Sequence, residues 1–195
     1  MSRMIVSMMT SIDNYIEGPG RALDWNIESP GFTRYCEEML AETDTMLFGR
    51  VSYEMMIAYW PAAETDPKQS SSQQAFAKTM NTLPKVVLSR TLARATWNNT
   101  TIARDVEDLR TVKEKAKKNV MVFGGAGIIS AVRAAGLVDE WRVIVNPVVL
   151  GAGTPLFANV KERFSLRHLR TETLDSGVTI LAYEPRRATD AEAGE

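Results

Sequence analysis

The chain has 195 residues, of which 45% are hydrophobic and 24% are charged. This length lies at the upper end of one ordinary domain, and the composition is typical of a soluble globular protein. The 24 acidic and 23 basic residues give a net charge of −1, which offers no global attraction to nucleic acid or to an anionic membrane. One cysteine, Cys36, and one histidine, His168, exclude an internal disulfide and disfavour both a conventional zinc site and Ser-His-Asp chemistry.

The N-terminal segment does not have the pattern of a targeting signal. Its apolar residues are interrupted by Ser2, Ser7, Thr10 and Ser11, and no basic region precedes an unbroken apolar stretch. No window approaches the 18 or more apolar residues of a membrane span. We therefore expect a cytoplasmic protein with no membrane or nucleic-acid partner and no bound metal.

Short apolar runs bounded by turn residues predict the strands. These runs cover residues 3–10, 45–49, 85–89, 119–123 and 140–150. Pro147 interrupts the last run, which indicates a bulge or a sheet edge. Segments 164–174 and 177–185 are typical of a C-terminal hairpin, and the polar residues 186–195 are expected to form a disordered tail.

Apolar side chains at helical spacing predict the helices between these strands. Ser29 can cap the first helix, with Pro30 in its first turn, and the apolar stripe of this helix places Cys36 in the core. The other helices are expected from near Ser52 to Pro61, around 75–80, over 105–118 and over 128–135, with a polar loop at 62–74. This alternation predicts a single α/β domain over residues 1–185, with a mixed and mostly parallel sheet.

Residues 122–129, VFGGAGII, place three glycines between a strand and a helix. At such a turn, free N–H groups and the positive end of the helix can hold an anion. The alternative is a tight turn that needs glycine only for its backbone angles, and these residues alone leave both interpretations open. The usual dinucleotide fingerprint does not fit, because Ser130 stands where its last glycine belongs.

The order of five segments resembles the dihydrofolate reductase-like superfamily, in the branch shared with the reductase domain of the riboflavin-biosynthesis deaminase–reductase. The segments are SIDNYIEGPG with LDW (11–25), LFGRVSYE (47–54), KVVLSR (85–90), VFGGAG (122–127) and GLVDEWRVIVNPVVLGAGTPLF (136–157). The resemblance extends from about residue 3 to 184 and implies a single-domain dihydrofolate reductase-like fold that binds NADPH. It also implies a homodimer, for which segment 140–157 is a candidate surface.

The same resemblance implies which residues hold the cofactor. Arg50 is expected at the 2′-phosphate of NADPH, and an ion pair with Glu54 is the alternative role for this side chain. Ser89 and Arg90 are expected to form a second phosphate contact, the glycine turn to support the pyrophosphate, and the first loop to border the nicotinamide. The full set is Ile16, Gly18, Gly49, Arg50, Val51, Ser52, Ser89, Arg90, Gly124, Gly125, Ala126, Gly127 and Ile128.

Two departures from the family pattern concern the substrate. Dihydrofolate reductases carry a carboxylate on the first helix, and aligning Trp25-Asn26 with the family's Trp-Asn puts Pro30 at that position. The riboflavin-pathway reductases carry a glutamate before the paired glycines, where this chain has Phe123. Neither a folate nor the riboflavin-pathway uracil substrate is therefore favoured.

Substrate and catalytic residues are less sharply indicated. Trp25, Tyr53 and Thr154 are expected to border the substrate, and Asp13 and Tyr53 are the catalytic candidates. Asp13 is more simply a turn former, and Tyr53 is equally a packing residue on its helix. Asn14 follows Asp13 where the family carries glycine, and asparagine tolerates a left-handed backbone.

The function expected from these features is NADPH-dependent hydride transfer to a small heterocyclic or carbonyl-type substrate. The absent first-helix carboxylate motivates an alternative, namely a dimeric nucleotide-binding protein of the same fold without turnover.

Overall fold

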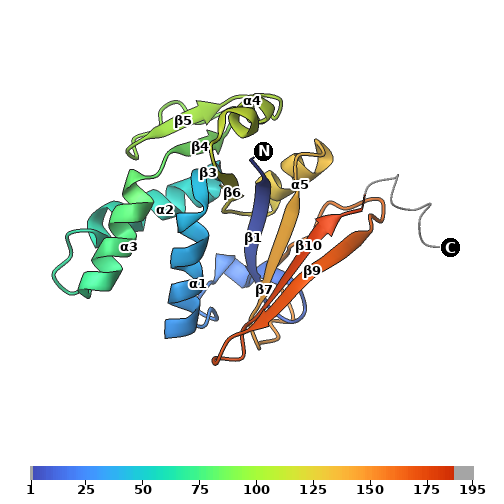
Figure 1. Ribbon diagram of the computed structural model, residues 1–195, viewed down its shortest axis with the longest axis horizontal. Helices are drawn as coiled ribbons and strands as arrows, with labels where there is room; N and C mark the ends of the chain where they lie inside the picture. Colours follow the sequence, from blue (N-terminus) through green and yellow to red (C-terminus); the bar gives the residue numbers. More distant parts are fainter. Residues whose placement is uncertain (1, 187–195) are drawn as a thin grey trace.

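An eight-stranded sheet organises residues 2–186, the part of the chain that the computed structural model describes (Figure 1). The strand order is β5-β4-β3-β6-β1-β7-β10-β9, and all neighbours from β5 to β7 are parallel. The hairpin of β9 and β10 closes the sheet by antiparallel pairing. The strands are β1 Met4–Thr10, β3 Thr43–Gly49, β4 Lys85–Leu88, β5 Thr100–Ala103, β6 Asn119–Val122, β7 Glu140–Val145, β9 Leu166–Thr173 and β10 Thr179–Pro185.

A second, two-stranded sheet pairs β2 (Tyr15–Glu17) with β8 (Thr154–Pro155). The helices are α1 Pro30–Ala41, α2 Arg50–Ala63, α3 Ser71–Thr82, α4 Asp108–Lys115 and α5 Ala126–Ala134, with a short 3-10 helix η1 at Pro19–Arg21. These elements confirm the single-domain α/β fold with a mixed sheet. Residues 187–195 of the expected disordered tail lie outside the described residues. None of the helices between residues 2 and 186 is both long and apolar enough to cross a membrane.

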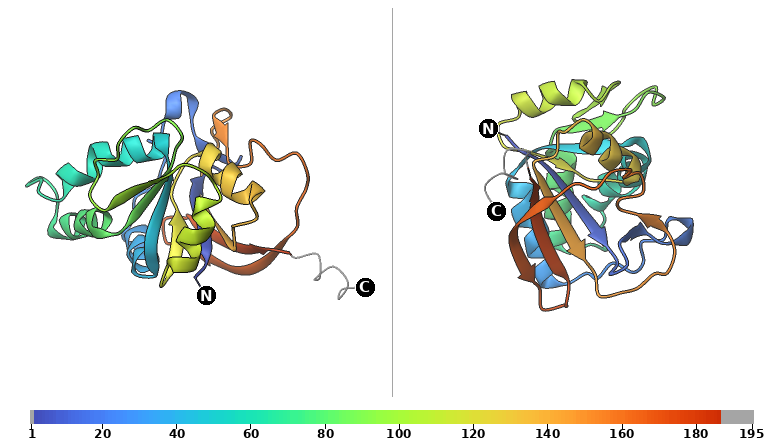
Figure 2. Two further views of the ribbon diagram at one scale, coloured as in Figure 1. Left: turned by 90° about the horizontal axis from the view of Figure 1, so that it is seen from above. Right: turned by 90° about the vertical axis from the view of Figure 1, so that its right-hand side faces the viewer.

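The alternation of side chains along the strands builds a core on each face of the sheet. In β6, Val120 and Val122 pack with α4 and α5, whereas Met121 packs with α1 on the opposite face. Figure 2 shows helices on both sides of the sheet. The same division holds in β3, where Leu47 joins the first face and Phe48 the second. Both faces of the central strands are covered by helices, as a parallel sheet requires.

Two predicted boundaries around the second helix are wrong. Helix α2 continues past Pro61 to Ala63, because a proline in the last turn removes one backbone hydrogen bond without preventing two further residues from remaining helical. Helix α3 begins at Ser71, inside the predicted loop 62–74. Its start is fixed by a capping box, in which Ser70 and Gln73 each accept a hydrogen bond from the other's backbone N–H.

The predicted strand 140–150 is also shorter than expected. Strand β7 ends at Val145, before Pro147, and lies between β1 and β10. Pro147 therefore marks the end of an inner strand, and neither a bulge nor a sheet edge. Trp141 and Ile144 are buried within the chain, whereas Val143 and Val145 are half-buried, and a partner surface in segment 140–157 stays a prediction.

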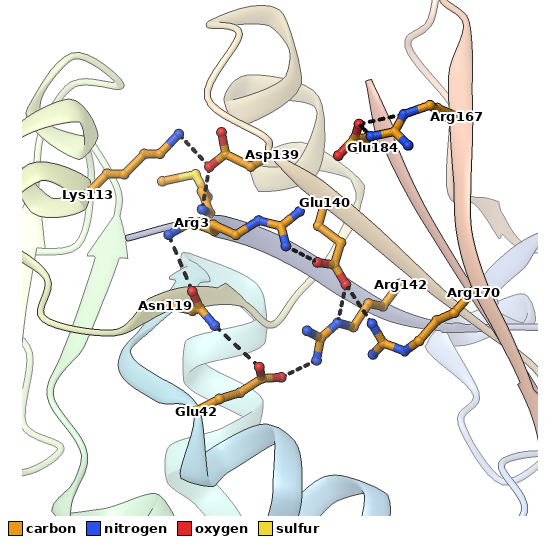
Figure 3. A network of polar contacts seen from close by, with 11 residues as sticks. Arg3, Glu42, Lys113, Asn119, Asp139, Glu140, Arg142, Arg167, Arg170 and Glu184 are labelled. Atoms are coloured by element: carbon orange, nitrogen blue, oxygen red, sulfur yellow. Dashed lines mark hydrogen bonds and ion pairs between the residues drawn. The ribbon is translucent and has the colours of Figure 1, made fainter. Parts of the chain in front are cut away.

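Buried charges join β7 to the C-terminal end of α1 and to the edge strand β9 (Figure 3). Glu140 is only 1% exposed and accepts hydrogen bonds or ion pairs from Arg142 at 2.7 Å, Arg3 at 2.9 Å and Arg170 at 3.5 Å. Arg142 also donates to Glu42 just beyond α1. Burial alone lowers the pKa of Arg142, but its bonds to Glu42 and Glu140 outweigh burial and raise that pKa above its ordinary value.

We predict that Glu140→Gln destabilises the fold by about 3 kcal/mol, because Arg142 loses one of its buried counter-charges. Glu107→Gln is the matched control, since Glu107 forms an exposed ion pair with Arg110 of a kind that contributes at most about 1 kcal/mol. Urea unfolding of both variants measures the two losses in free energy of unfolding. Equal losses would show that the buried network does not stabilise the chain.

Candidate functional site

The glycine turn after β6 lies directly against the first turn of α2. Gly124 has φ 152°, and a Cβ atom on it would be 2.6 Å from Ser52 Oγ. The backbone N–H of Gly125 donates to the same Ser52 oxygen at 2.9 Å. Glycine is therefore required at position 124, both because of the backbone angle and because α2 approaches so closely.

This contact brings the N-termini of two helices together. Gly49 is the N-cap of α2 and Gly125 that of α5, and within residues 2–186 neither helix start has a side-chain cap. A Cβ on Gly49 would lie 3.4 Å from Ile128 in the first turn of α5. The two strands that feed these helices, β3 and β6, are adjacent and parallel. Uncapped N–H groups and two positive helix ends thus converge at the carboxyl edge of the sheet, which favours an anion.

A cavity of about 1700 Å³ opens in front of these helix starts. Because pockets for one drug-sized ligand are typically about 300–1,000 Å³, it has room for a cofactor and a substrate together. Ten of the thirteen predicted cofactor residues line it: Ile16, Gly49, Arg50, Val51, Ser52, Gly124, Gly125, Ala126, Gly127 and Ile128. Of the other three, Gly18 is buried next to the wall.

Arg50 lines the cavity and also forms the alternative ion pair expected from its sequence position. Its Nη1 donates to both carboxylate oxygens of Glu54, at 2.9 and 3.0 Å, and its side chain is 46% exposed. An exposed pair four residues apart on a helix contributes only about 0.3–0.5 kcal/mol. The guanidinium is therefore weakly restrained at the edge of the cavity.

The other expected phosphate contact lies outside the cavity-lining residues. Ser89 is buried, and its Oγ accepts the backbone N–H groups of Thr91 at 3.3 Å and Leu92 at 3.0 Å, so it forms a turn after β4. Arg90 is 84% exposed and lies 3.6 Å from Asp105. The structure does not bring these two residues together with Arg50 in one cavity wall.

Tyr53 lies in the core and not at the cavity. It is 2% exposed, and its hydroxyl accepts the backbone N–H groups of Thr96 and Trp97, both at 2.9 Å. This is the packing role, and it leaves Tyr53 badly placed to contact a substrate or to supply a proton. Trp25 is half-buried, donates to the carbonyl of Ala22 at 2.9 Å and does not line the cavity.

Asp13 acts as a turn former that ties two loops together. Its carboxylate accepts the backbone N–H groups of Leu150 at 3.1 Å and Gly151 at 2.7 Å. The Ser11 hydroxyl, and after it these two N–H groups, lower the pKa of Asp13 to about 2, so it remains ionised and cannot donate a proton near neutral pH. Asn14 has φ 67°, which confirms the left-handed backbone predicted for it.

The model of the RibD C-terminal domain family matches residues 3–180. The chain belongs to this family. It is 35% identical to the uncharacterized protein YyaP of Bacillus subtilis (strain 168) over 187 residues, which cover 93% of this chain and 94% of YyaP. The match confirms the branch that the sequence motifs indicate.

Two solved structures share the fold of this chain. One is a diaminohydroxyphosphoribosylaminopyrimidine deaminase/5-amino-6-(5-phosphoribosylamino)uracil reductase of Thermotoga maritima, with TM-score 0.67, 14% identity, and coverage of 95% of this chain and 57% of that one. The other is the dihydrofolate reductase of Enterococcus faecalis, complexed with NADP(H), with TM-score 0.62, 11% identity, and coverage of 95% and 97%. At these identities the likeness shows the dihydrofolate reductase-like fold alone.

Several cavity residues escape prediction from the sequence. Helix α2 presents an uncovered apolar stripe to the cavity, in which the predicted Val51 is 40% exposed and the unpredicted Met55 and Tyr59 are 46% and 51% exposed. On the β1 and α1 side, Cys36 lies in the wall, and burial raises the pKa of its thiol to about 12, so it is not a thiolate nucleophile. The neighbouring lining residues are mostly apolar: Met9, Phe32, Met39, Phe123 and Ile144.

We predict that Gly124→Ala destabilises the protein by more than about 2 kcal/mol, because the new Cβ meets Ser52 and the backbone angle is strained. Gly125→Ala is the matched control: its φ is −55°, and its Cβ would lie 3.8 Å from Ser52 Oγ. This second change should alter the free energy of unfolding by less than about 1 kcal/mol. Chemical denaturation distinguishes the two, and similar stability of both variants would contradict the required contact.

Proposed function

We propose that this protein is an NADPH-dependent reductase that transfers a hydride to a small heterocyclic or carbonyl-type substrate. The observation that carries the proposal is the pair of uncapped helix starts, joined through Gly124 and Ser52, at one large cavity. Membership of the RibD C-terminal domain family and the fold shared with an NADP(H)-complexed dihydrofolate reductase support it.

The residues present fit a dinucleotide phosphate. Gly125 and Gly127 line the cavity, and a Cβ on Gly127 would meet nothing within 4 Å, so the turn presents backbone without side chains to a ligand. We propose that the first-turn N–H groups of α2 and α5 hold the diphosphate and that Arg50 holds the 2′-phosphate. When bound, the reduced nicotinamide supplies the hydride.

The protein itself positions the substrate and excludes water from it. The apolar wall made by Met9, Phe32 and Phe123 can hold a planar acceptor while keeping bulk solvent from it. Because Asp13 stays ionised and Tyr53 is buried elsewhere, we propose that water reaching the cavity supplies the proton. A homodimer remains a prediction.

Arg50→Ala should weaken NADPH binding roughly ten- to hundredfold, because a charge-assisted hydrogen bond contributes about 1.5–3 kcal/mol. NADH lacks the 2′-phosphate and should be affected much less. Isothermal titration with both nucleotides measures the difference. Arg163→Ala, at an exposed arginine that does not line the cavity, is the control and should leave both affinities unchanged, while equal losses for NADPH and NADH in Arg50→Ala would count against the assignment.

The function itself is tested by binding and by turnover. We expect NADPH to raise the melting temperature more than NADH, and at least one member of a panel of pterins, pyrimidines and quinones to support NADPH oxidation. Tight NADPH binding without oxidation by any acceptor would favour a nucleotide-binding protein without turnover. No stabilisation by either nucleotide would reject both functions.

A further inference from the structure

Glu17 is a carboxylate in the cavity wall to which the proposed function gives no role. It lies on β2, and its neighbours Ile16 and Gly18 are both buried. Its own side chain is half-buried and lines the cavity. The other carboxylates that line the cavity are exposed: Glu28, Glu37 and Glu54. Glu17 is therefore the cavity carboxylate most withdrawn from water.

The pairing of β2 with β8 fixes the position of Glu17. Thr154 is its register partner, and Thr154 Oγ1 donates to Glu17 Oε1 at 2.7 Å. The preceding Gly153 has φ 143°, and a Cβ on it would lie 2.0 Å from the Glu17 carbonyl oxygen. Only glycine permits this approach of the two strands. The carboxylate is thus held by a hydrogen bond from Thr154. The backbone of Glu17 is in turn packed so closely against position 153 that this residue has to be glycine.

Two half-buried side chains of the cavity lining carry unpaired acceptors. Glu17 Oε2 has no hydrogen-bond or ion-pair partner among the described residues, because Thr154 engages only Oε1. Asn26 lines the same cavity, and its buried Oδ1 also lacks a partner within residues 2–186. Since carboxylate and amide oxygens accept hydrogen bonds, a ligand in this position has to bring donors.

The surrounding wall limits the shape and polarity of the rest of that ligand. Met9, Phe32 and Phe123 line the cavity with apolar surface, which suits the faces of a flat ring. Pro30 and Phe123 also line the cavity, at the two positions where the family resemblance leads one to expect an acid. Glu17 lies on a different element from both.

We propose that Glu17, positioned by Thr154, binds an N–H donor of a planar nitrogen heterocycle and thereby selects the substrate. The inference rests on the proposed function, because it places this ring where the acceptor of the hydride would lie. The substrate then carries at least one ring N–H on an edge that faces β2, and a ring without such a donor is bound poorly.

Two probes that differ in their donors test this role. Lumazine is a bicyclic pyrimidinedione with ring N–H groups, and 1,3-dimethyllumazine has both of them blocked. With the protein saturated with NADP⁺, isothermal titration should show lumazine binding roughly ten- to hundredfold more tightly, the range of one hydrogen bond to a charged group. Equal affinities, or no binding of lumazine at millimolar concentration while NADP⁺ binds, would overturn the proposal.

Three variants separate recognition from structure. In Glu17→Gln, Thr154 still engages Oε1, so the amide NH₂ faces the ligand donor, and the preference for lumazine should disappear while dimethyllumazine affinity and NADP⁺ affinity stay constant. Thr154→Val should reduce the preference in part. Glu38→Gln, the same change at an exposed position of α1 outside the cavity, should leave it intact. Retained discrimination in Glu17→Gln contradicts the role of Glu17, whereas failure of wild type to bind NADP⁺ contradicts the proposed function instead.

Discussion

The contact between Gly124 and Ser52 is the constraint on which the rest of the site depends. It lets the end of β6 approach the first turn of α2 more closely than any side chain at position 124 would permit. As a result, two helices that would otherwise begin apart present their unpaired N–H groups to the same space. The positive potential at this edge of the sheet therefore comes from the backbone N–H groups of two helix starts, and the protein needs few basic side chains there.

The fold was largely predictable because its signals are local. Ser29 accepts the backbone N–H of Phe32 at 3.1 Å, as the capping pattern indicates, and the apolar runs of the inner strands are found in the sheet. Strand β5 escaped prediction because Thr100–Ala103 is short, half polar and at the sheet edge. The start of α3 escaped because a serine-rich segment resembles a loop until the reciprocal bonds of Ser70 and Gln73 are considered.

The candidate site was most predictable where it is made of backbone. The glycine turn and the helix starts follow from local sequence, whereas the surroundings of a side chain depend on distant segments. Tyr53 lies on an apolar stripe, but only tertiary structure shows that its hydroxyl meets Thr96 and Trp97, more than 40 residues along the chain. Glu17 gave no signal, because its partner Thr154 lies 137 residues away. Arg50 shows the intermediate case, since the spacing to Glu54 indicated the ion pair but could not show that the pair borders a cavity.

The two hydrogen bonds of Asp13 have a mechanical consequence. They join the loop that leads into β2 to the loop that precedes β8, and the backbone N–H of Leu156 adds a third bond, to the Asn14 carbonyl. Neither loop can then swing outward without carrying the other. The side of the cavity that contains Glu17 and Thr154 is therefore held together as one unit by these three hydrogen bonds.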